Sequence, residues 1–278
     1  MSAPTATIEP TRPVAPRQRR PWVATGVRAG FLLHLGLIAR RPMEMIAVAT
    51  TPLLTVVFTS IVRQAGREEV VAAAVVGSGL IGVWVLMLGE VAETVSADRS
   101  WGTLPMLMSA PMSMPAILTG RLLAAAAVGA LTFVEAVAAG MLLLHAPLHV
   151  AHPAAFAATA VLTLLSVVAT GALLAPLFLA SRISMLFEIV LAYPFYILGA
   201  VMFPVSELPG WAQGISNVIF LRWCTDLMRD SLRPGEVPDL AGGLLALVVI
   251  ATVSYALGVA MLYRITGRLR RLGSTEEV

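Results

Sequence analysis

The stretch that decides the fold is Val70–Ala92, VVAAAVVGSGLIGVWVLMLGEVA, in which Glu90 is the one ionisable side chain. A helix that crosses the hydrocarbon core of a bilayer needs about 20 predominantly apolar residues. This run reaches that length and contains no proline. It therefore predicts a transmembrane helix, and similar runs occur on both sides of it.

Five further apolar runs extend the prediction to an all-α integral membrane protein with six transmembrane helices. The expected spans are 43–62, 70–92, 117–144, 154–180, 185–203 and 240–263. The composition favours the same class, because 58% of the 278 residues are hydrophobic and 13% are charged. Soluble domains carry about 25% charged residues.

The distribution of arginine predicts the orientation. All 19 basic residues are arginines, and six spans place most of them on the side of the N-terminus. The five on the opposite side are Arg63, Arg67, Arg222, Arg229 and Arg233. Because cytoplasmic segments carry the excess of basic residues, both termini are expected in the cytoplasm, with the chain in the cell membrane.

Three segments are expected along the chain: a disordered cytoplasmic tail over 1–21, a transmembrane domain over 22–264 and a second cytoplasmic tail over 265–278. The domain begins with Trp22–Arg41, where apolar residues recur at helical spacing but Arg28 and His34 interrupt. This pattern is typical of a helix that lies in the membrane interface.

Two segments between spans are too irregular for simple turns. Three prolines follow the second span, so only a short helix is expected there, over about Asp98–Met108; an ordinary interfacial loop is the alternative. The segment Pro204–Pro238 is too short and too charged to cross twice. It suits a re-entrant outer hairpin buried against protein, and the alternative is a lid on the outer surface.

Ionisable and aromatic residues within the spans are the next candidates. Glu135 lies within the third span, where a charge is costly and is by default a candidate for function; substrate contact and a structural hydrogen bond both remain open. A substrate path is expected at Tyr193, Phe195 and Tyr196 beside the helix-breaking Pro194, with simple packing as the alternative. Glu90 and Glu93 share a helix face and are expected to meet Arg99 or Arg121.

The chain lacks the residues of several chemistries. It has no lysine, so it cannot form a Walker A phosphate loop. Its single cysteine, Cys224, excludes an internal disulfide. No catalytic residue, metal site, bound cofactor or nucleic-acid partner is expected.

Two motifs resemble those of the membrane subunits of ABC type-2 exporters, especially the daunorubicin-resistance-like permeases of actinobacteria. The first is Arg99–Leu104 followed by Ser109–Pro111, similar to the family's charged residue, Gly-Thr-Leu and Pro pattern. The second is Phe203–Trp211, followed by Asn217 and Asp226–Arg229. The family often has Asn-Pro where this chain has Asn217 and Val218.

The resemblance implies one half of an exporter that a separate cytoplasmic ATPase drives, with ATP and Mg on that partner. It also implies a second permease subunit and a drug, antibiotic, lipid or glycan-type substrate. The coupling residues expected on this basis are Glu93, Asp98, Arg99, Trp101, Gly102, Thr103 and Leu104. The outer hairpin is expected to depend on Pro204, Leu208, Pro209, Trp211, Asn217 and Arg229.

Two rival functions follow from the residues alone. A membrane-embedded enzyme needs clustered acid, base or metal-binding groups, whereas the carboxylates here are scattered. An ion-coupled secondary transporter could use Glu135 as its proton site, although no inverted repeat is evident. A requirement for a partner ATPase separates both rivals from the exporter subunit.

Overall fold

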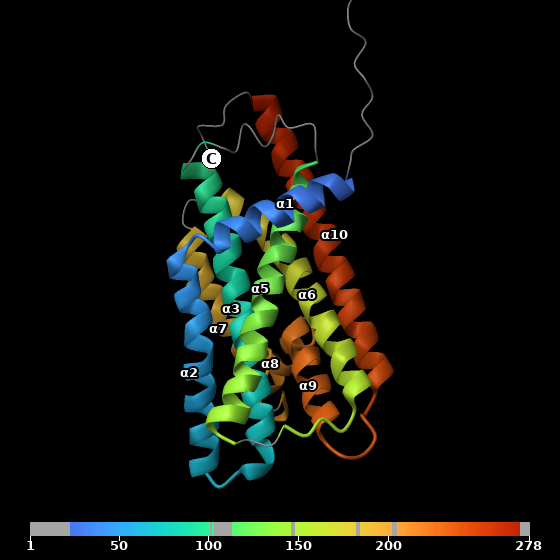
Figure 1. Ribbon diagram of the computed structural model, residues 1–278. Helices are drawn as coiled ribbons and strands as arrows, with labels where there is room; N and C mark the ends of the chain where they lie inside the picture. The colour runs from blue at the N-terminus through green and yellow to red at the C-terminus, as the bar shows by residue number, and fades with distance from the viewer. Residues whose placement is uncertain are drawn as a thin grey trace, which may run out of the picture.

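The computed structural model describes residues 23–100, 102, 113–145, 148–181, 184–201 and 205–272. For residues 42–47, 69, 99, 184–187 and 269–272 it describes the backbone alone. Within these ranges all regular structure is helical (Figure 1). The elements are α1 (Val23–Ile38), α2 (Pro42–Gln64), η1 (Glu68–Val70), α3 (Val71–Ser100), α5 (Met114–Leu143), α6 (Pro153–Ala180), α7 (Ser184–Leu198), η2 (Val205–Glu207), α8 (Gly210–Ser216), α9 (Phe220–Leu232) and α10 (Leu240–Leu272). The prediction of an all-helical membrane fold is confirmed.

Four of the described helices are long and apolar enough to cross a membrane: α3, α5, α6 and α10. The remaining two predicted spans correspond to α2, which has 23 residues, and α7, which has 15. All six helices lie side by side in one bundle (Figure 1).

Two helices extend well beyond the apolar runs that predicted them. α3 continues to Ser100 instead of ending near 92, and α10 continues to Leu272 instead of 263. In both, the added turns are polar but contain no proline and no interior glycine pair. Hydropathy therefore marks where a helix leaves the apolar layer, whereas helix propensity decides where it ends.

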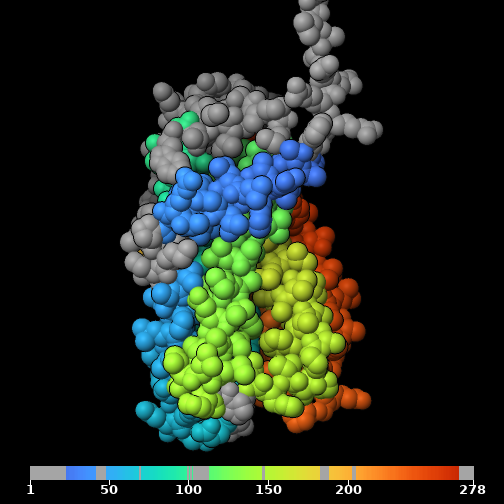
Figure 2. All heavy atoms as spheres, viewed as in Figure 1, coloured from blue at the N-terminus to red at the C-terminus, as the bar shows by residue number. Residues whose placement is uncertain are grey.

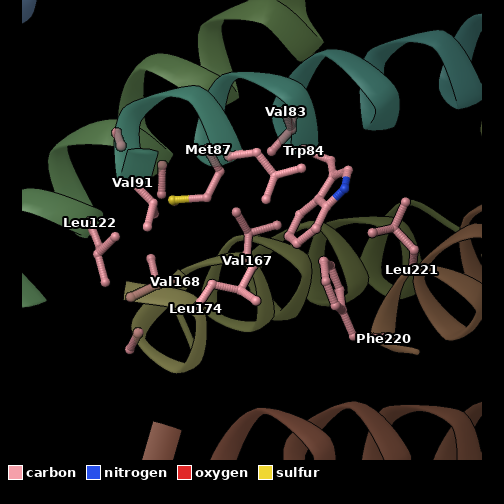
Figure 3. Packing of buried hydrophobic residues seen from close by; sticks show 14 of the residues in the cluster. Val83, Trp84, Met87, Val91, Leu122, Val167, Val168, Leu174, Phe220 and Leu221 are labelled. Atoms are coloured by element: carbon pink, nitrogen blue, oxygen red, sulfur yellow. The ribbon is translucent and has the colours of Figure 1, made fainter. Parts of the chain in front are cut away.

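α3 is the central helix of the bundle, since α2, α5, α6, α7 and α9 all pack against it. Its Trp84 side chain is fully buried. The indole stacks on Phe195 of α7 at 4.6 Å between ring centroids and meets the edge of Phe220 of α9 at 5.5 Å. Figure 3 shows Trp84 and Phe220 in the same layer as Val167 of α6. This aromatic contact joins three helices at mid-length of α3.

α1 runs across the long helices instead of along them and lies against α5 (Figures 1 and 2). Glycines make the close crossing possible. A Cβ added at Gly30 would collide with the carbonyl oxygen of Ile117, and one at Gly120 would collide with that of Val27. The backbones of α1 and α5 are therefore in direct contact, and the predicted interfacial helix has the expected transverse direction.

The segment after α7 returns to the centre of the bundle. α9 begins at Phe220, against Trp84. Trp84 lies thirteen residues into α3, roughly 20 Å along its axis. α9 ends near the start of α6, where the backbone N–H of His152 donates to the carbonyl of Ser231 at 3.0 Å. α9 thus runs from mid-length of α3 to the end of the bundle that is opposite α1.

Candidate coupling site

Three ion pairs connect the last turns of α3 to neighbouring elements at the α1 end of the bundle. They join His34 to Glu90, Arg41 to Glu93, and Arg121 to Asp98. We call these six residues the coupling cluster. The three carboxylates lie on α3, and their partners come from α1, the turn after α1, and α5.

The His34–Glu90 pair is the most deeply buried of the three. Its Nε2–Oε2 distance is 2.9 Å, and the side chains are 4% and 3% exposed. A buried carboxylate is costly unless it is paired and hydrogen-bonded. Because His34 belongs to α1, the transverse helix supplies the partner that α3 requires at this depth.

The Arg121–Asp98 pair fastens the end of α3 to the first turns of α5. One guanidinium nitrogen, Nη1, donates to Asp98 Oδ2 at 2.6 Å, and Nη2 donates to Oδ1 at 3.3 Å. This two-point geometry fixes the planes of the guanidinium and carboxylate groups relative to each other and makes the pair stronger than a single contact. Both residues are largely buried, with side chains 9% and 14% exposed.

The third pair is more open to solvent, and a fourth carboxylate lies nearby. Arg41 Nη1 is 3.3 Å from Glu93 Oε1, and the side chains are 22% and 38% exposed. Glu188 of α7 packs against Gly89 of α3, where an added Cβ would lie 3.3 Å from its Oε1 atom.

The predicted coupling residues fall into two groups. Glu93 and Asp98 belong to α3 rather than to a loop, and the structure brings them together with Arg41 and Arg121. Gly102 follows α3 with a positive φ of 63°, a conformation that favours glycine. Trp101, Thr103 and Leu104 lie outside the described residues, as does the side chain of Arg99.

Sequence reasoning missed two members of the cluster, His34 and Arg41. It expected Glu90 and Glu93 to meet Arg99 or Arg121; Arg121 pairs with Asp98 and Glu90 with His34, while the side chain of Arg99 lies outside the described residues. The signal was present: a histidine interrupts an apolar helix that is expected on the same side of the membrane as the two glutamates. What could not be inferred was that α1 folds back against α5, which brings His34 to Glu90 of α3.

The three aromatic residues of the expected substrate path do not share one environment. Tyr193 is 62% exposed, whereas Tyr196 is half-buried and meets its ring at 6.0 Å. Phe195 stacks on Trp84 inside the bundle. Phe195 is therefore a packing residue here, and Tyr193 is the one that faces outward.

Glu135 lies on the outward face of α5. Its neighbours on that face are Leu131, Val134 and Met141, which are 51%, 59% and 50% exposed. The Oε2 atom of Glu135 is buried and has no hydrogen-bond partner within the described part of the chain. The structure thus places Glu135 away from the coupling cluster, among side chains that face the surroundings of the bundle.

The hairpin residues are spread over the surface and interior of the α8–α9 segment. Leu208 is buried, Pro209 precedes α8, and Trp211 is 71% exposed. The carbonyl of Asn217 accepts a hydrogen bond from Trp223 Nε1 at 3.0 Å. Arg229 Nη2 donates to the carbonyl of Val201 at 2.6 Å, which ties α9 to the end of α7. Pro204 lies outside the described residues.

The coupling cluster joins three elements at one end of α3, just before the connection to α5. Each of its three carboxylates lies 2.6 to 3.3 Å from a nitrogen of a basic side chain. α1, α3 and α5 are therefore fastened to one another at this point.

Comparison with known proteins agrees with this architecture. A family model described as ABC-2 type transporter matches residues 34–232, a range that includes the whole coupling cluster and the α8–α9 segment. No curated protein matches the chain. Since the matched range covers more than half of the chain, the protein is a member of the ABC-2 type transporter family.

Proposed function

We propose that this chain is the membrane subunit of an ATP-driven exporter, and that the coupling cluster receives the movement of a cytoplasmic ATPase. Family membership makes it a permease subunit with an ATPase partner. The observation that supports the site is the set of three ion pairs in the last turns of α3. They lie directly before the connection whose sequence resembles the family's coupling motif.

The proposal includes six spans in a bacterial cell membrane, with both termini in the cytoplasm. The spans are α2, α3, α5, α6, α7 and α10. α1 lies across the cytoplasmic end with its outward-facing leucines, Leu32, Leu33 and Leu35, exposed to the interface. The polar turns of α3 and α10 extend beyond α1 at that end (Figure 1).

The α8–α9 segment forms the re-entrant outer hairpin of the proposed transporter. The contact of Phe220 with Trp84 supports this, because it places the start of α9 deep in the bundle. α9 itself has an apolar side against the core and a charged side with Arg222, Asp226 and Arg229. Its backbone is thereby covered by protein, as a non-spanning segment at membrane depth requires.

ATP and Mg bind to the partner ATPase, since this chain has no Walker A lysine. A second permease subunit completes the path. The exposed apolar side chains on α2 (Leu53, Val57, Ile61) and α7 (Ile189, Val190, Tyr193) are available to it. The substrate class is a hydrophobic drug, antibiotic, lipid or glycan-type compound, and a role in antibiotic resistance follows if the substrate is a drug.

A charge exchange at Arg121 and Asp98 tests the coupling site. The single variants Asp98→Arg and Arg121→Asp bury like charges against each other, so transport is expected to fall at least roughly tenfold. The double variant restores the pair with its charges exchanged and is expected to recover much of the transport. Transport is measured in vesicles that contain the chain and its partner ATPase.

The matched control is the Arg222–Asp226 pair on α9, at 3.7 Å and more exposed. The same exchange there is expected to change transport by less than about twofold. Recovery of ATPase with the tagged chain is measured in parallel. If both Asp98 and Arg121 single variants transport normally, the coupling role is wrong; if the chain transports in vesicles without any ATPase, the exporter-subunit assignment is wrong.

A further inference from the structure

A pocket of ≈ 180 Å³ opens at the end of the bundle opposite the coupling cluster. It lies between the end of α2, the first turns of α3, η2 and the end of α9. α9 ends at this end of the bundle, and the proposed orientation puts this end on the outer side of the membrane. Neither the coupling mechanism nor the family match assigns it a role.

The floor of the pocket is apolar. Phe58 and Val62 of α2 face Ala73, Ala74, Gly77 and Ile81 of α3. Small residues on α3 leave the space open, since Ala73, Ala74, Gly77 and Ser78 stand where longer side chains would fill it. Ile81 lies ten residues from the start of α3, so the floor reaches roughly 15 Å into the bundle.

The rim is basic. Arg67, Arg229 and Arg233 line the pocket together with one acidic residue, Glu207. Arg67 and Arg233 are exposed, and Arg229 is oriented by its hydrogen bond to the Val201 carbonyl. None of these three arginines has an ion pair within 4.0 Å in the described ranges.

The acidic neighbours leave this rim with an excess of positive charge. Glu207 is exposed and is the one carboxylate that lines the pocket. Asp226 and Asp230 also lie on α9 and do not line the pocket. Asp226 is paired with Arg222 at 3.7 Å, whereas Asp230 interacts electrostatically with Arg233 and Arg229. Among the described residues, three guanidinium groups and one carboxylate therefore line this space, and Asp230 offsets part of the positive charge.

We propose that this pocket binds an anionic amphiphile, with its phosphate or carboxylate group at the three arginines and its apolar chain over the α2–α3 floor. Guanidinium groups bind such anions by paired hydrogen bonds. A concave apolar surface with a few convergent polar groups is typical of a ligand site. The occupant is either a resident anionic lipid or the exported compound; its assignment as cargo rests on the proposed function, whereas binding does not.

The test is protection of a single introduced cysteine. The natural Cys224 is fully buried, so Val62→Cys gives a site in the pocket over a low background. Its reaction rate with uncharged N-ethylmaleimide is measured in the purified full-length chain. The probes are dihexanoyl phosphatidylglycerol below its micelle concentration, dihexanoyl phosphatidylcholine and inorganic phosphate.

Phosphatidylglycerol is expected to slow labelling at Val62→Cys at least roughly fivefold, while the other two probes change it by less than about twofold. Combining Val62→Cys with Arg67→Gln and Arg233→Gln is expected to remove the protection. Equal protection by phosphatidylcholine, equal protection by phosphate, or protection that survives the arginine changes would each overturn the proposal.

Two controls keep the result specific. Arg222→Gln removes an arginine of α9 outside the pocket and should leave the protection intact. Leu142→Cys, at an exposed position on α5, should label at one rate with every probe, which shows that the probes do not consume the reagent. The buried Cys224 should stay unreactive in all backgrounds, which shows that the variants remain folded.

The two sources are separated in vesicles that contain the partner ATPase. Occupancy that falls when ATP is turned over identifies cargo, and occupancy that is unchanged identifies a resident lipid. Both results uphold the site. Protection in the isolated chain does not depend on the ATPase, so failure of this proposal and failure of the exporter assignment are seen in different measurements.

Discussion

At the residue scale, the His34–Glu90 pair shows how burial holds two side chains of the coupling cluster together. Both side chains are almost completely buried, so neither can regain its hydration without moving an element. A buried ion pair of this kind contributes little compared with an apolar pair, but removal of one partner leaves an uncompensated group. The pair therefore fixes where α1 lies on α3 more than it adds stability.

Replacing one partner should therefore be severe. His34→Leu removes the imidazole that lies 2.9 Å from the Glu90 carboxylate, and the expected loss of unfolding free energy is about 3–5 kcal/mol. The double variant His34→Leu with Glu90→Leu should recover most of it, because two apolar groups replace the pair. Thermal unfolding of the detergent-purified chain measures both; a double variant as unstable as the single one would contradict this account.

Glu135 offers a test of the secondary-transport alternative. It lies on the outward face of α5, away from the coupling cluster, and ATP-driven export requires no proton site there. Glu135→Gln keeps the shape of the side chain and removes its charge, so transport driven by ATP is expected to stay within about twofold. The measurement is uptake into inverted vesicles with and without an uncoupler of the proton gradient. Abolished transport in the variant, together with sensitivity to the uncoupler in the unaltered chain, would favour ion coupling.

The residue scale is also where sequence reasoning reached its limit. Asp98 and Glu93 are expected to be coupling residues from their position and the resemblance, and that role stays a prediction. The partner of Glu93, Arg41, follows α1, and α1 is placed by its crossing of α5 at Gly30 and Gly120, a long-range contact that no local pattern records. The sequence could thus predict that the charges exist, and the fold was needed to show how they are matched.

At the scale of elements, α9 depends on one aromatic contact. Its first residue, Phe220, is 2% exposed and meets the edge of Trp84 in the interior. The other end is held by polar groups, including the hydrogen bond from Arg229 to Val201. An element fixed at its deep end by packing and at its outer end by hydrogen bonds has one position in the bundle.

Truncation of that contact should loosen the element. Phe220→Ala is expected to lower the unfolding free energy by about 3–5 kcal/mol and to raise hydrogen exchange in α9. Trp211→Ala is the matched control in the same segment, since Trp211 is 71% exposed, and it should leave both measurements unchanged. Equal effects of the two variants would show that α9 is not fixed from its deep end.

The elements themselves were largely predictable. Each long helix was predicted from an apolar run long enough to span a bilayer. Within the bilayer, a single segment can hydrogen-bond all its backbone N–H and C=O groups only as a helix. The ends were not predictable to the same degree, as α3 and α10 show. Their last turns are polar, and hydropathy carries no information about a helix that continues beyond the apolar layer.

At the scale of the whole molecule, the two ends have different chemistry. One end has the matched coupling cluster, and the other has a basic rim around an open pocket. The arginine distribution predicts that the cluster faces the cytoplasm. In the proposed transporter, the coupling cluster and the pocket therefore lie at opposite ends of the molecule.

Cysteine labelling in intact cells tests this orientation. Gly36→Cys on α1 and Gly267→Cys on α10 both have open space around the added Cβ, and both are expected to react with an impermeant maleimide only after the cells are permeabilised. Glu236→Cys, after α9, is expected to react in intact cells. The buried Cys224 provides the unreactive background. Labelling of Gly36→Cys from outside would reverse the orientation or change the number of spans.

One further property follows from the unbroken length of α3. Prolines interrupt α2, α6 and α7, whereas α3 has 30 residues and none, so it is a stiff rod about 45 Å long. If Trp84 near its midpoint acts as a fulcrum, a tilt of about 10° moves each end by roughly 4 Å, in opposite directions. A push at Asp98 would then reach Ala73 and Ala74 with no hinge between them, so work done by a motor on one side of the membrane would change the width of the opening on the other.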